Sequence, residues 1–506
     1  ESFLPNLSSG ENPFTSAAIW TARLLESKEV ILEIPSSPFF IEFHDSFESS
    51  PTGDMAPTPV TATLVVIICL LCMYNHNHII NFVQHIKCMK KLNIEIETHG
   101  CKLNFADSQS IAKKFYSAGH NVFSDNKSGL RDIYILNSCT VTHVADSKAR
   151  QSIRKVKRNN PKALTIMTGC YAERDKEKIK EINEVDLVIT NQEKKDILKK
   201  VYDYLNEDLS EIPELDTYPL IGRSRASIKI QEGCNQVCSY CIIPFVRGRE
   251  KSIDPNEIIN KINNASRNNI KEVVLTGTQL GNYGFDLKNI DLKKLIRLVL
   301  NETSIERIRV SSLQPKEIDN ELLGIWKSNS RLCPHFHLPL QSGSDEILKK
   351  MRRRYSSEDF INITSMIRKH LPQASITTDV IVGFPSEKEK DFENTIQTIN
   401  NSHLNNLHVF PYSVRPKTSA YYSNEHNSPE IIKNRSSQLI KLSKVITAKS
   451  MENIIGKERS ILWEGKDRDS GLTEDYYRVV RNTTKYPSEV ISRQKIKGLE
   501  KDKLYI

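Results

Sequence analysis

Three cysteines in one short segment are the residues of this 506-residue chain best suited to chemistry. Cys234, Cys238 and Cys241 stand four and three residues apart, and the segment begins with Gly233 and is followed by Pro244. Thiolates at this spacing can hold three irons of a cubic iron–sulfur cluster and leave the fourth iron free for a substrate or cofactor. That arrangement indicates catalysis rather than electron transfer. A zinc knuckle or a disulfide pair is the alternative, although no fourth Cys or His stands nearby to close a zinc site.

A second set of three cysteines comes from separate parts of the chain. Cys101, Cys139 and Cys170 each follow a segment that we expect to be a strand, and the first and last of them directly follow a glycine. The carboxyl ends of parallel strands meet at one edge of a sheet, so these thiols should converge. Glycine would let the backbone approach a cluster closely. Three unrelated buried cysteines, or a zinc site without a fourth protein ligand, are the alternatives.

The elements around this second set alternate between strand and helix from residue 89 to about 220. Strands are expected over 92–97, 132–136, 163–167 and 186–189, and helices over 108–118, 144–158, 175–182 and 193–205. Four such units predict an α/β domain with a parallel sheet and helices on both faces, in a flavodoxin-like or Rossmann-like arrangement.

A longer alternation covers 221 to about 424, in a domain that we bound at 221–450. Strands are expected over 225–231, 272–276, 307–311, 335–338, 377–382 and 407–410, and a helix fills each gap, the first of them N-capped by Asp254. Six such units predict an open (βα)6 partial TIM barrel with its site at the carboxyl ends of the strands. The first strand leads into Cys234.

Several strand ends of this barrel carry small or polar residues that suit a polar nucleoside cofactor. These residues are Thr276, Gly277, Thr278, Ser311, Ser312 and Gln341. Each alone is ordinary turn chemistry, but their position after successive strands favours one shared site. Asp379 lies inside an apolar strand and is either a satisfied buried carboxylate or a residue that faces the cavity.

The two ends of the chain are less informative. Over 451–506, short alternating segments predict a small antiparallel β-barrel. Trp463, Tyr476 and Tyr477, interleaved with basic residues such as Lys466, could stack on bases there; because acids nearly match the bases, a β-appendage without a binding role is the alternative. Residues 1–88 show no sustained periodicity, and the apolar run 60–73 is shorter than the roughly twenty residues of a spanning helix. We expect an appended leader outside the working enzyme and assign no role to its cysteines, Cys69, Cys72 and Cys88; a membrane anchor or signal peptide is the alternative.

The composition is that of an ordinary soluble protein, with 26% charged and 38% hydrophobic residues. A net charge of +9 permits an RNA partner without demonstrating one. Ten cysteines in a chain of this length do not form a disulfide scaffold and point to metal ligation in a reducing compartment, which predicts a cytoplasmic protein without a stable membrane partner.

The first triplet, with Tyr240 just before its last cysteine, resembles that of the radical S-adenosylmethionine enzymes. The resemblance implies a [4Fe–4S] cluster whose open iron chelates the methionine moiety of S-adenosylmethionine. Reductive cleavage of the sulfonium would then release a 5′-deoxyadenosyl radical.

The whole of residues 89–506 resembles the methylthiotransferases. That resemblance implies a second, auxiliary [4Fe–4S] cluster on Cys101, Cys139 and Cys170 that carries or activates sulfur, and a C-terminal RNA-binding barrel called TRAM. Family members act on isopentenyladenosine or threonylcarbamoyladenosine in tRNA, or on an aspartate of a ribosomal protein. The segments 137–142, 168–173, 241–249 and 408–413 resemble the threonylcarbamoyladenosine branch, while Gln314 stands where an acid is expected.

The implied function is conversion of N6-threonylcarbamoyladenosine beside the tRNA anticodon, at position 37, to its 2-methylthio derivative. The implied partners are tRNA, a sulfur donor and an electron donor such as flavodoxin or ferredoxin. Basic residues on the helix 144–158 could hold the anticodon stem, although such a run is often only a solvated face: Lys148, Arg150, Arg154, Lys155 and Arg158. A non-catalytic iron–sulfur RNA-binding protein is the alternative of another class.

Overall fold

The computed structural model describes residues 91–124, 131–207, 224–464, 469–481, 490–500 and 502–506. The predicted leader, its apolar run and its cysteines lie outside the described residues. None of the described helices combines the length and the apolar character needed to cross a membrane.

The N-terminal domain is a five-stranded parallel sheet in the order β2-β1-β3-β4-β5. Its strands are β1 (Asn93–Thr98), β2 (Asn121–Phe123), β3 (Ile133–Ser138), β4 (Leu164–Gly169) and β5 (Leu187–Ile189). Every residue of β3 and β4 is buried, as in a sheet covered on both faces. This strand order is the flavodoxin-like one, in agreement with the prediction. The short strand β2 was not predicted.

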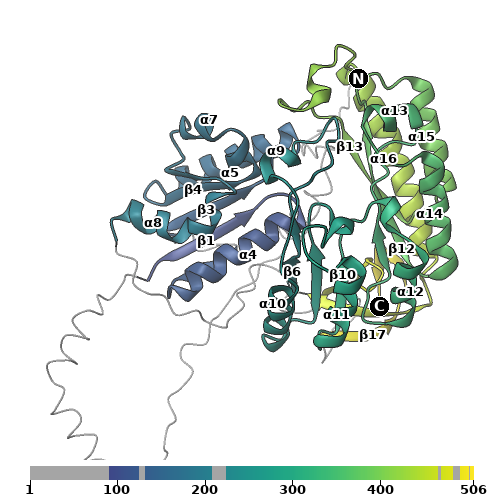
Figure 1. The fold of residues 1–506 in the computed structure, drawn as a ribbon, viewed down its shortest axis with the longest axis horizontal. Coiled ribbons are helices and arrows are strands. Elements are labelled where there is room, and N and C mark those ends of the chain that lie inside the picture. Colours follow the sequence, from purple (N-terminus) through teal and green to yellow (C-terminus); the bar gives the residue numbers. More distant parts are fainter. Residues whose placement is uncertain (1–90, 125–130, 208–223, 465–468, 482–489, 501) are drawn as a thin grey trace, which may run out of the picture. The chain divides into compact units, whose positions relative to one another are not determined.

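Helices cover both faces of this sheet. They are α4 (Lys102–Ser117), α5 (His143–Asn159), α6 (Cys170–Arg174), α7 (Lys176–Lys180) and α8 (Ile197–Leu205). In Figure 1, α4 and α8 lie on one face and α5 and α7 on the other. The helix expected over 175–182 is shorter than predicted: α7 begins after Asp175, whose backbone is not helical, and ends at Lys180.

The second region contains six parallel strands, as predicted for a (βα)6 barrel. They are β6 (Arg225–Lys229), β9 (Glu272–Thr276), β10 (Arg307–Val310), β11 (His335–His337), β12 (Ser375–Val382) and β13 (Asn406–Pro411). They form two three-stranded sheets, β10-β9-β6 and β11-β12-β13, which a parallel bridge between Ile308 and Leu332 connects.

Helices follow these strands on the outside of the barrel. They are α10 (Pro255–Arg267), α11 (Leu292–Glu302), α12 (Asn320–Ser328), α13 (Asp345–Lys350), α14 (Ser357–His370) and α15 (Glu389–Asn401). Asp254 caps α10 by accepting from the backbone N–H of Asn256 and Glu257, as expected. Strands and helices bury one continuous apolar core.

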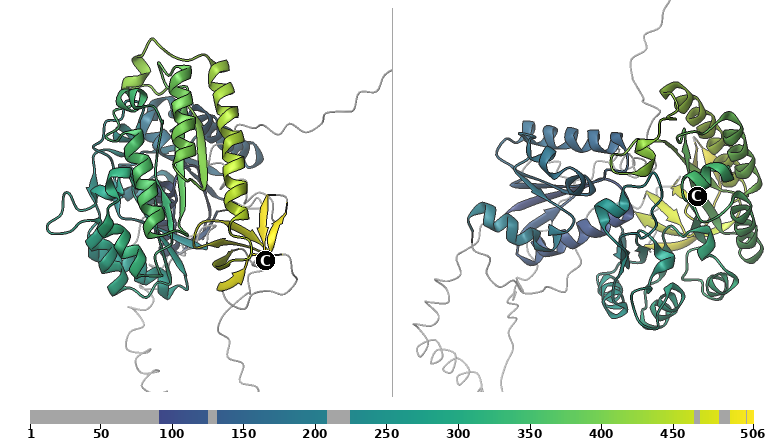
Figure 2. Two further views of the ribbon diagram at one scale, coloured as in Figure 1. Left: turned by 90° about the vertical axis from the view of Figure 1, so that its right-hand side faces the viewer. Right: turned by 45° about the horizontal axis from the view of Figure 1, so that its top comes forward.

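A long helix, α16 (Pro429–Glu452), leads to the C-terminal sheet and was not predicted (Figure 2). The sheet has the order β17-β14-β15-β16-β19-β18. Its strands are β14 (Glu458–Glu464), β15 (Ser470–Thr473), β16 (Arg478–Val480), β17 (Ile491–Lys495), β18 (Gly498–Glu500) and β19 (Lys503–Tyr505). The expectation of a wholly antiparallel domain is wrong at one pair, because β16 and β19 run parallel.

The turn between β15 and β16 docks against the barrel strands. Tyr476 stacks on His335 with ring centroids 4.3 Å apart, and Arg309 donates to the backbone carbonyls of Thr473 and Glu474 at 3.3 and 3.1 Å. Trp463 and Tyr477 are buried in the core of the C-terminal domain. The suggestion that these three aromatic side chains stack on bases is therefore wrong, since each is already packed against protein. Lys466 lies outside the described residues.

Candidate active site formed by two cysteine triplets

The structure brings Cys101, Cys139 and Cys170 to one edge of the N-terminal sheet. They follow β1, β3 and β4, which are adjacent strands in register, with Thr98 paired to Asn137 and Ser138 to Gly169. The three cysteines therefore follow neighbouring strand ends, as the sequence predicted.

Two glycines let these loops come together. A Cβ on Gly100 would lie 2.7 Å from Cys139 Cβ and 3.1 Å from its Sγ. Gly169 has φ +97°, and a Cβ there would lie 2.3 Å from the carbonyl oxygen of Ser138. Neither position tolerates a side chain, so both glycines are required for the close approach of the cysteine loops.

The triplet Cys234, Cys238 and Cys241 lies on the loop after β7 (Gln231–Glu232). The backbone N–H of Cys234 donates to Gly248 O, and that of Cys241 donates to Cys238 O, both at 3.1 Å. Arg353 donates from Nη1 to Cys238 Sγ at 3.3 Å. The loop is thus held in a fixed shape by its own backbone and by one arginine.

The arrangement of the thiols argues against a single metal ion at either triplet. A tetrahedral zinc with bonds of about 2.3 Å to sulfur would bring the sulfurs within about 3.8 Å of one another. In the part of the chain that the structure describes, neither triplet gathers its three sulfurs within 4.8 Å. Wider spacing suits ligands to separate irons of one cluster. None of the six forms a disulfide.

Burial also fits these cysteines to metal ligation rather than to free nucleophilic chemistry. It raises the pKa of Cys234 to about 11 and the pKa of Cys139 and Cys241 to about 12. At neutral pH such thiols stay protonated unless a metal stabilises the thiolate. Three thiols without a fourth protein ligand form a donor set that fits an iron–sulfur cluster with one open iron.

One arginine connects the two triplets. The helix α9 (Ile243–Arg247) directly follows the second triplet, and its Val246 packs against Cys170 together with Ile242. Arg247, whose side chain is 1% exposed, donates from Nε to Cys170 Sγ at 3.3 Å. Its Nη1 donates to Asp107 at 2.6 Å and to Glu232 at 2.7 Å. A side chain from the loop of one triplet thereby contacts a thiol of the other.

Two lysines complete this buried charge network. Lys194 and Lys229 each donate to a carboxylate oxygen of Asp107 at 2.9 Å. Burial alone would raise the pKa of Asp107, but the charges of Lys194 and Arg247 hold it well below its usual value. Sequence reasoning included Arg247 only as part of a family motif, and neither Asp107 nor Lys194 stood in any recognisable pattern.

The strand-end residues proposed to bind a nucleoside cofactor include one buried group without a partner. Gln231 Oε1 accepts from the backbone N–H of Thr278 and Gln279 at 2.8 and 2.9 Å, which fixes the loop after β9. Thr278 Oγ1 is buried and has no hydrogen-bond partner among the described residues. A buried hydroxyl of this kind fits a polar ligand such as S-adenosylmethionine.

The other predicted cofactor residues occupy different environments. Thr276 and Ser311 are buried at the ends of β9 and β10, whereas Ser312 is exposed. Gln341 has φ +64° and bridges to Val380 of β12. A Cβ on Gly277 would lie 2.9 Å from Gln231 Oε1, so a side chain there would crowd the loop. Tyr240 packs edge-on against Phe384, with centroids 6.4 Å apart.

Comparisons with known proteins agree with this geometry. The radical SAM superfamily model matches residues 228–399, and the model of the uncharacterized protein family UPF0004 matches residues 93–190. Threonylcarbamoyladenosine tRNA methylthiotransferase MtaB of Aquifex aeolicus (strain VF5) is 37% identical, over 79% of this chain and 99% of its own length. The chain belongs to the tRNA methylthiotransferase family. The MtaB enzyme of Bacillus subtilis (strain 168) is 36% identical, over 76% of this chain and 90% of its own length.

Relatives with a different named substrate are equally similar to this methylthiotransferase. The tRNA-2-methylthio-N(6)-dimethylallyladenosine synthase of Thermosipho melanesiensis (strain DSM 12029 / CIP 104789 / BI429) is 38% identical, over 78% of this chain and 92% of its own length. Identity alone therefore does not decide between the two tRNA substrates.

Inside the barrel of the methylthiotransferase, Asp379 is paired with two histidines. His337 Nε2 and His408 Nδ1 each lie 3.1 Å from a different carboxylate oxygen of Asp379. Burial alone would raise the pKa of Asp379, but the two imidazoles hold it below its usual value. Thr377 Oγ1 extends the network to His335 at 3.0 Å. Sequence reasoning identified only Asp379, because the histidines come from neighbouring strands whose pairing a single sequence does not display.

Gln314, which stands where the family pattern has an acid, is part of another polar cluster. Gln314 accepts a hydrogen bond from Arg353, the arginine that also contacts Cys238. Glu317 lies beside it, accepts from Gln279 and the backbone N–H of Gln314, and has its pKa raised by burial to about 7. A carboxyl group is therefore present one helical turn after the expected position.

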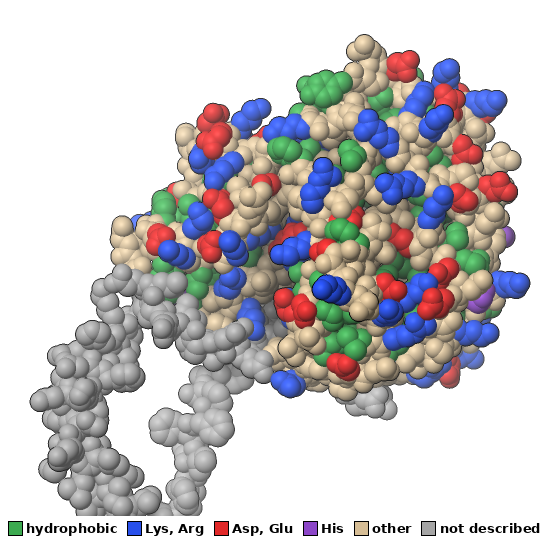
Figure 3. Space-filling model, in the orientation of Figure 1, with side chains coloured by type: hydrophobic (Ala, Val, Ile, Leu, Met, Phe, Trp, Pro, Cys, Tyr) green, Lys and Arg blue, Asp and Glu red, His purple; other side chains and the backbone are tan. Residues whose placement is uncertain are grey.

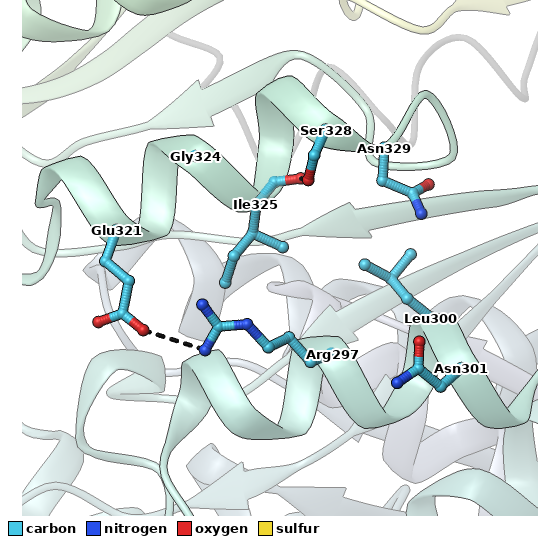
Figure 4. Close-up of a pocket in the computed structure, with 8 residues that line it drawn as sticks. All are labelled: Arg297, Leu300, Asn301, Glu321, Gly324, Ile325, Ser328 and Asn329. Atoms are coloured by element: carbon cyan, nitrogen blue, oxygen red, sulfur yellow. Dashed lines mark hydrogen bonds and ion pairs between the residues drawn. The ribbon is translucent and has the colours of Figure 1, made fainter.

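A separate hollow lies between α11 and α12, on the outer side of the barrel (Figure 4). Arg297 and Glu321 form an ion pair across it at 3.0 Å. Its lining includes no cysteine, and we assign it no role.

Proposed function

We propose that this chain is a threonylcarbamoyladenosine tRNA methylthiotransferase that converts N6-threonylcarbamoyladenosine at position 37 to its 2-methylthio derivative. The observation that carries the proposal is the direct contact between the two triplets: α9 continues from Cys241 and packs on Cys170, and Arg247 donates to that thiol. A target carbon could be held between two clusters arranged in this way.

The chemistry requires such a pair of sites. The C2–H bond of adenine is unactivated, so no positioned His or carboxylate removes this hydrogen as a proton. When bound, two [4Fe–4S] clusters and S-adenosylmethionine would supply the radical that removes it and the methylated sulfur that replaces it. Cys234, Cys238 and Cys241 would hold one cluster, and Cys101, Cys139 and Cys170 the other. The cofactor contacts would come from Thr278 and the neighbouring strand ends.

The polar barrel interior supports the threonylcarbamoyl substrate over the dimethylallyl one. His337, Asp379 and His408 line the inner side of three adjacent strands and remain partly accessible. A dimethylallyl group would only cover these partly accessible polar side chains with apolar carbon, whereas a threonylcarbamoyl group offers them oxygens and N–H groups. The motifs at 137–142, 168–173, 241–249 and 408–413 point the same way.

The remaining assignments complete the proposal. Residues 89–220 would form the auxiliary-cluster domain, 221–450 the radical S-adenosylmethionine core and 451–506 a TRAM-like RNA-binding domain, with residues 1–88 outside the working enzyme. A flavodoxin or ferredoxin would deliver electrons, and a separate donor would supply sulfur. On the face drawn in Figure 3, Lys and Arg are interspersed with Asp and Glu, so recognition of tRNA there needs more than charge.

The decisive experiment supplies the reconstituted protein with S-adenosylmethionine, dithionite and one of three substrates. These are tRNA that carries threonylcarbamoyladenosine, tRNA that carries dimethylallyladenosine, and ribosomal protein. Nucleoside or peptide mass spectrometry should find the methylthio product only with the first. Product only with another substrate would move the chain to a different branch, and absence of S-adenosylmethionine cleavage would favour a non-catalytic RNA-binding protein. In cells that lack the protein, an unchanged level of the methylthio nucleoside would also contradict the substrate assignment.

A further inference from the structure

Large exposed hydrophobic side chains concentrate around the two triplets. Twelve such side chains occur among the described residues, and six of them stand on segments that adjoin the cysteines. These six are Val141, Val144, Val237, Phe245, Tyr421 and Tyr422. They are 41–74% exposed, and Tyr422 is the most exposed of all. An apolar group of this kind marks an interaction surface rather than a packing feature.

The segments that carry these side chains contact one another. The short helix η4 (Ser419–Tyr422) is attached to the second cysteine loop, because the N–H of Ala420 donates to Ser239 O at 2.7 Å. Lys417, just before η4, places its Nζ 3.9 Å from the centre of the Phe245 ring. Near Cys139, the N–H of His143 donates to Ser413 Oγ at 3.1 Å. Contacts thus join the segments that carry the exposed side chains.

The reaction itself creates a need for such a surface. An adenosine whose C2 must reach between the two triplets has to leave the base stack of its loop. The nucleotides on either side then lose a stacking partner. Exposed aromatic rings can replace the lost stacking, and an adjacent cation can neutralise the phosphates that accompany those nucleotides.

We propose that Phe245, Tyr421 and Tyr422, with Lys417, form a stacking platform for the nucleotides that flank the modified adenosine. The proposal rests on the proposed function, because the occupant is its tRNA substrate. Single-stranded RNA fits better than a protein partner, since the rings are combined with a cation and adjoin the site where a base must enter.

Binding of a fluorescently labelled anticodon stem-loop RNA by the full chain tests the platform. Phe245→Ala and Tyr422→Ala should each raise the dissociation constant by at least about fivefold, as expected when a base loses the aromatic side chain on which it stacks. Phe245→Trp should retain binding. The matched control is Tyr204→Ala on α8, whose ring is 48% exposed against 45% for Phe245, and it should bind as the unaltered chain does. Iron content and melting temperature verify that each variant is folded.

A second measurement reports stacking itself. With 2-aminopurine beside the target adenosine, the unaltered chain should quench its fluorescence on binding, and Phe245→Ala or Tyr422→Ala should reduce that quenching. If the unaltered chain binds and modifies the RNA but the alanine variants match Tyr204→Ala in both measurements, the platform is wrong and the proposed function stands. If the unaltered chain does not bind the RNA, the proposed function itself fails.

Discussion

Arg247 and Arg353 each place a guanidinium against one cysteine sulfur, and their surroundings differ. Arg247 lies 3.3 Å from Cys170 Sγ and is also bonded to the carboxylates of Asp107 and Glu232. Arg353 lies 3.3 Å from Cys238 Sγ and is bonded to the neutral amide of Gln314. Hydrogen bonds to sulfur and nearby net charge set the potential of an iron–sulfur cluster. Clusters bound at the two triplets would therefore lie in different charge environments.

Replacement of Arg247 should lower the reduction potential of the auxiliary cluster proposed on Cys101, Cys139 and Cys170. Its N–H group stabilises the more negative, reduced form, so Arg247→Gln should shift the reduction equilibrium about tenfold toward the oxidised form, or about 59 mV for a one-electron couple. EPR-monitored dithionite titration measures this shift when Cys234, Cys238 and Cys241 are all replaced by Ala, so that only the auxiliary cluster forms. Lys229→Gln removes a positive charge from the same network without touching sulfur and should shift the potential less. An equal shift in both variants would show that only net charge matters.

The six cysteines should separate into two functional groups. Cys234→Ala should abolish 5′-deoxyadenosine formation, because the proposed radical-generating cluster loses a ligand. Cys139→Ala should retain that cleavage and lose methylthio product, because only the proposed sulfur-bearing site is altered. Chromatography of both products from one reaction measures the two effects together. Full product from Cys139→Ala would rule out an auxiliary cluster on these residues.

At the scale of elements, one buried carboxylate pairs with arginines near the amino ends of two neighbouring barrel strands, β9 and β10. Glu272 of β9 is buried and lies within 2.9 Å of both Arg307 and Arg309 of β10. Arg309 in turn donates to the turn before β16. Burial alone would raise the pKa of Glu272, but these arginines lower it to about 2. Its charge therefore connects the barrel to the C-terminal sheet.

This depressed pKa determines how stability should depend on pH. The folded value of about 2 lies below the ordinary value of 4.5, so the stabilisation is complete above about pH 4.5 and disappears as the pH falls from there toward 2. Glu272→Gln should lower the free energy of unfolding by about 3–5 kcal/mol at neutral pH, because it leaves buried arginines unpaired. Urea denaturation should show a smaller difference between variant and unaltered chain near pH 3. A difference independent of pH would contradict the role of the charge.

The positions of strands and helices could be predicted where the local sequence pattern agreed with a rule of sheet topology. Cys101, Cys139 and Cys170 could be placed together because each follows a strand of a parallel sheet, whatever the details of packing. The destination of Tyr476 could not be predicted, because a turn residue carries no local signal of the surface that it will contact. The sequence therefore led us to expect that Tyr476 binds RNA. The histidines around Asp379 were missed for the same reason, since their contact depends on strand register.

At the scale of the whole molecule, long-range charge pairs connect the two parts of the site. Asp146, close to Cys139 in sequence, accepts from Arg415 at 2.7 Å and from Arg174 at 3.0 Å. Asp107 and Arg247 form a second such connection. Charged residues are common along the chain, and nothing local distinguishes those that pair from those that face water. The placement of Cys101, Cys139 and Cys170 at neighbouring strand ends was therefore predictable, and the side chains that bring the two triplets together were not.

The region that starts at the first described strand should suffice for both clusters. The first described strand of the N-terminal sheet begins at Asn93, and the described contacts to the cysteine sulfurs, such as Arg247 to Cys170 and Arg353 to Cys238, join residues after it. A chain from Met89 to Ile506 should therefore bind about eight irons after reconstitution, as two four-iron clusters require, and should match the full chain in thermal unfolding. Iron analysis and calorimetry of the two chains side by side measure this. Loss of either cluster, or a clearly lower melting temperature, would mean that residues before Met89 support the working enzyme.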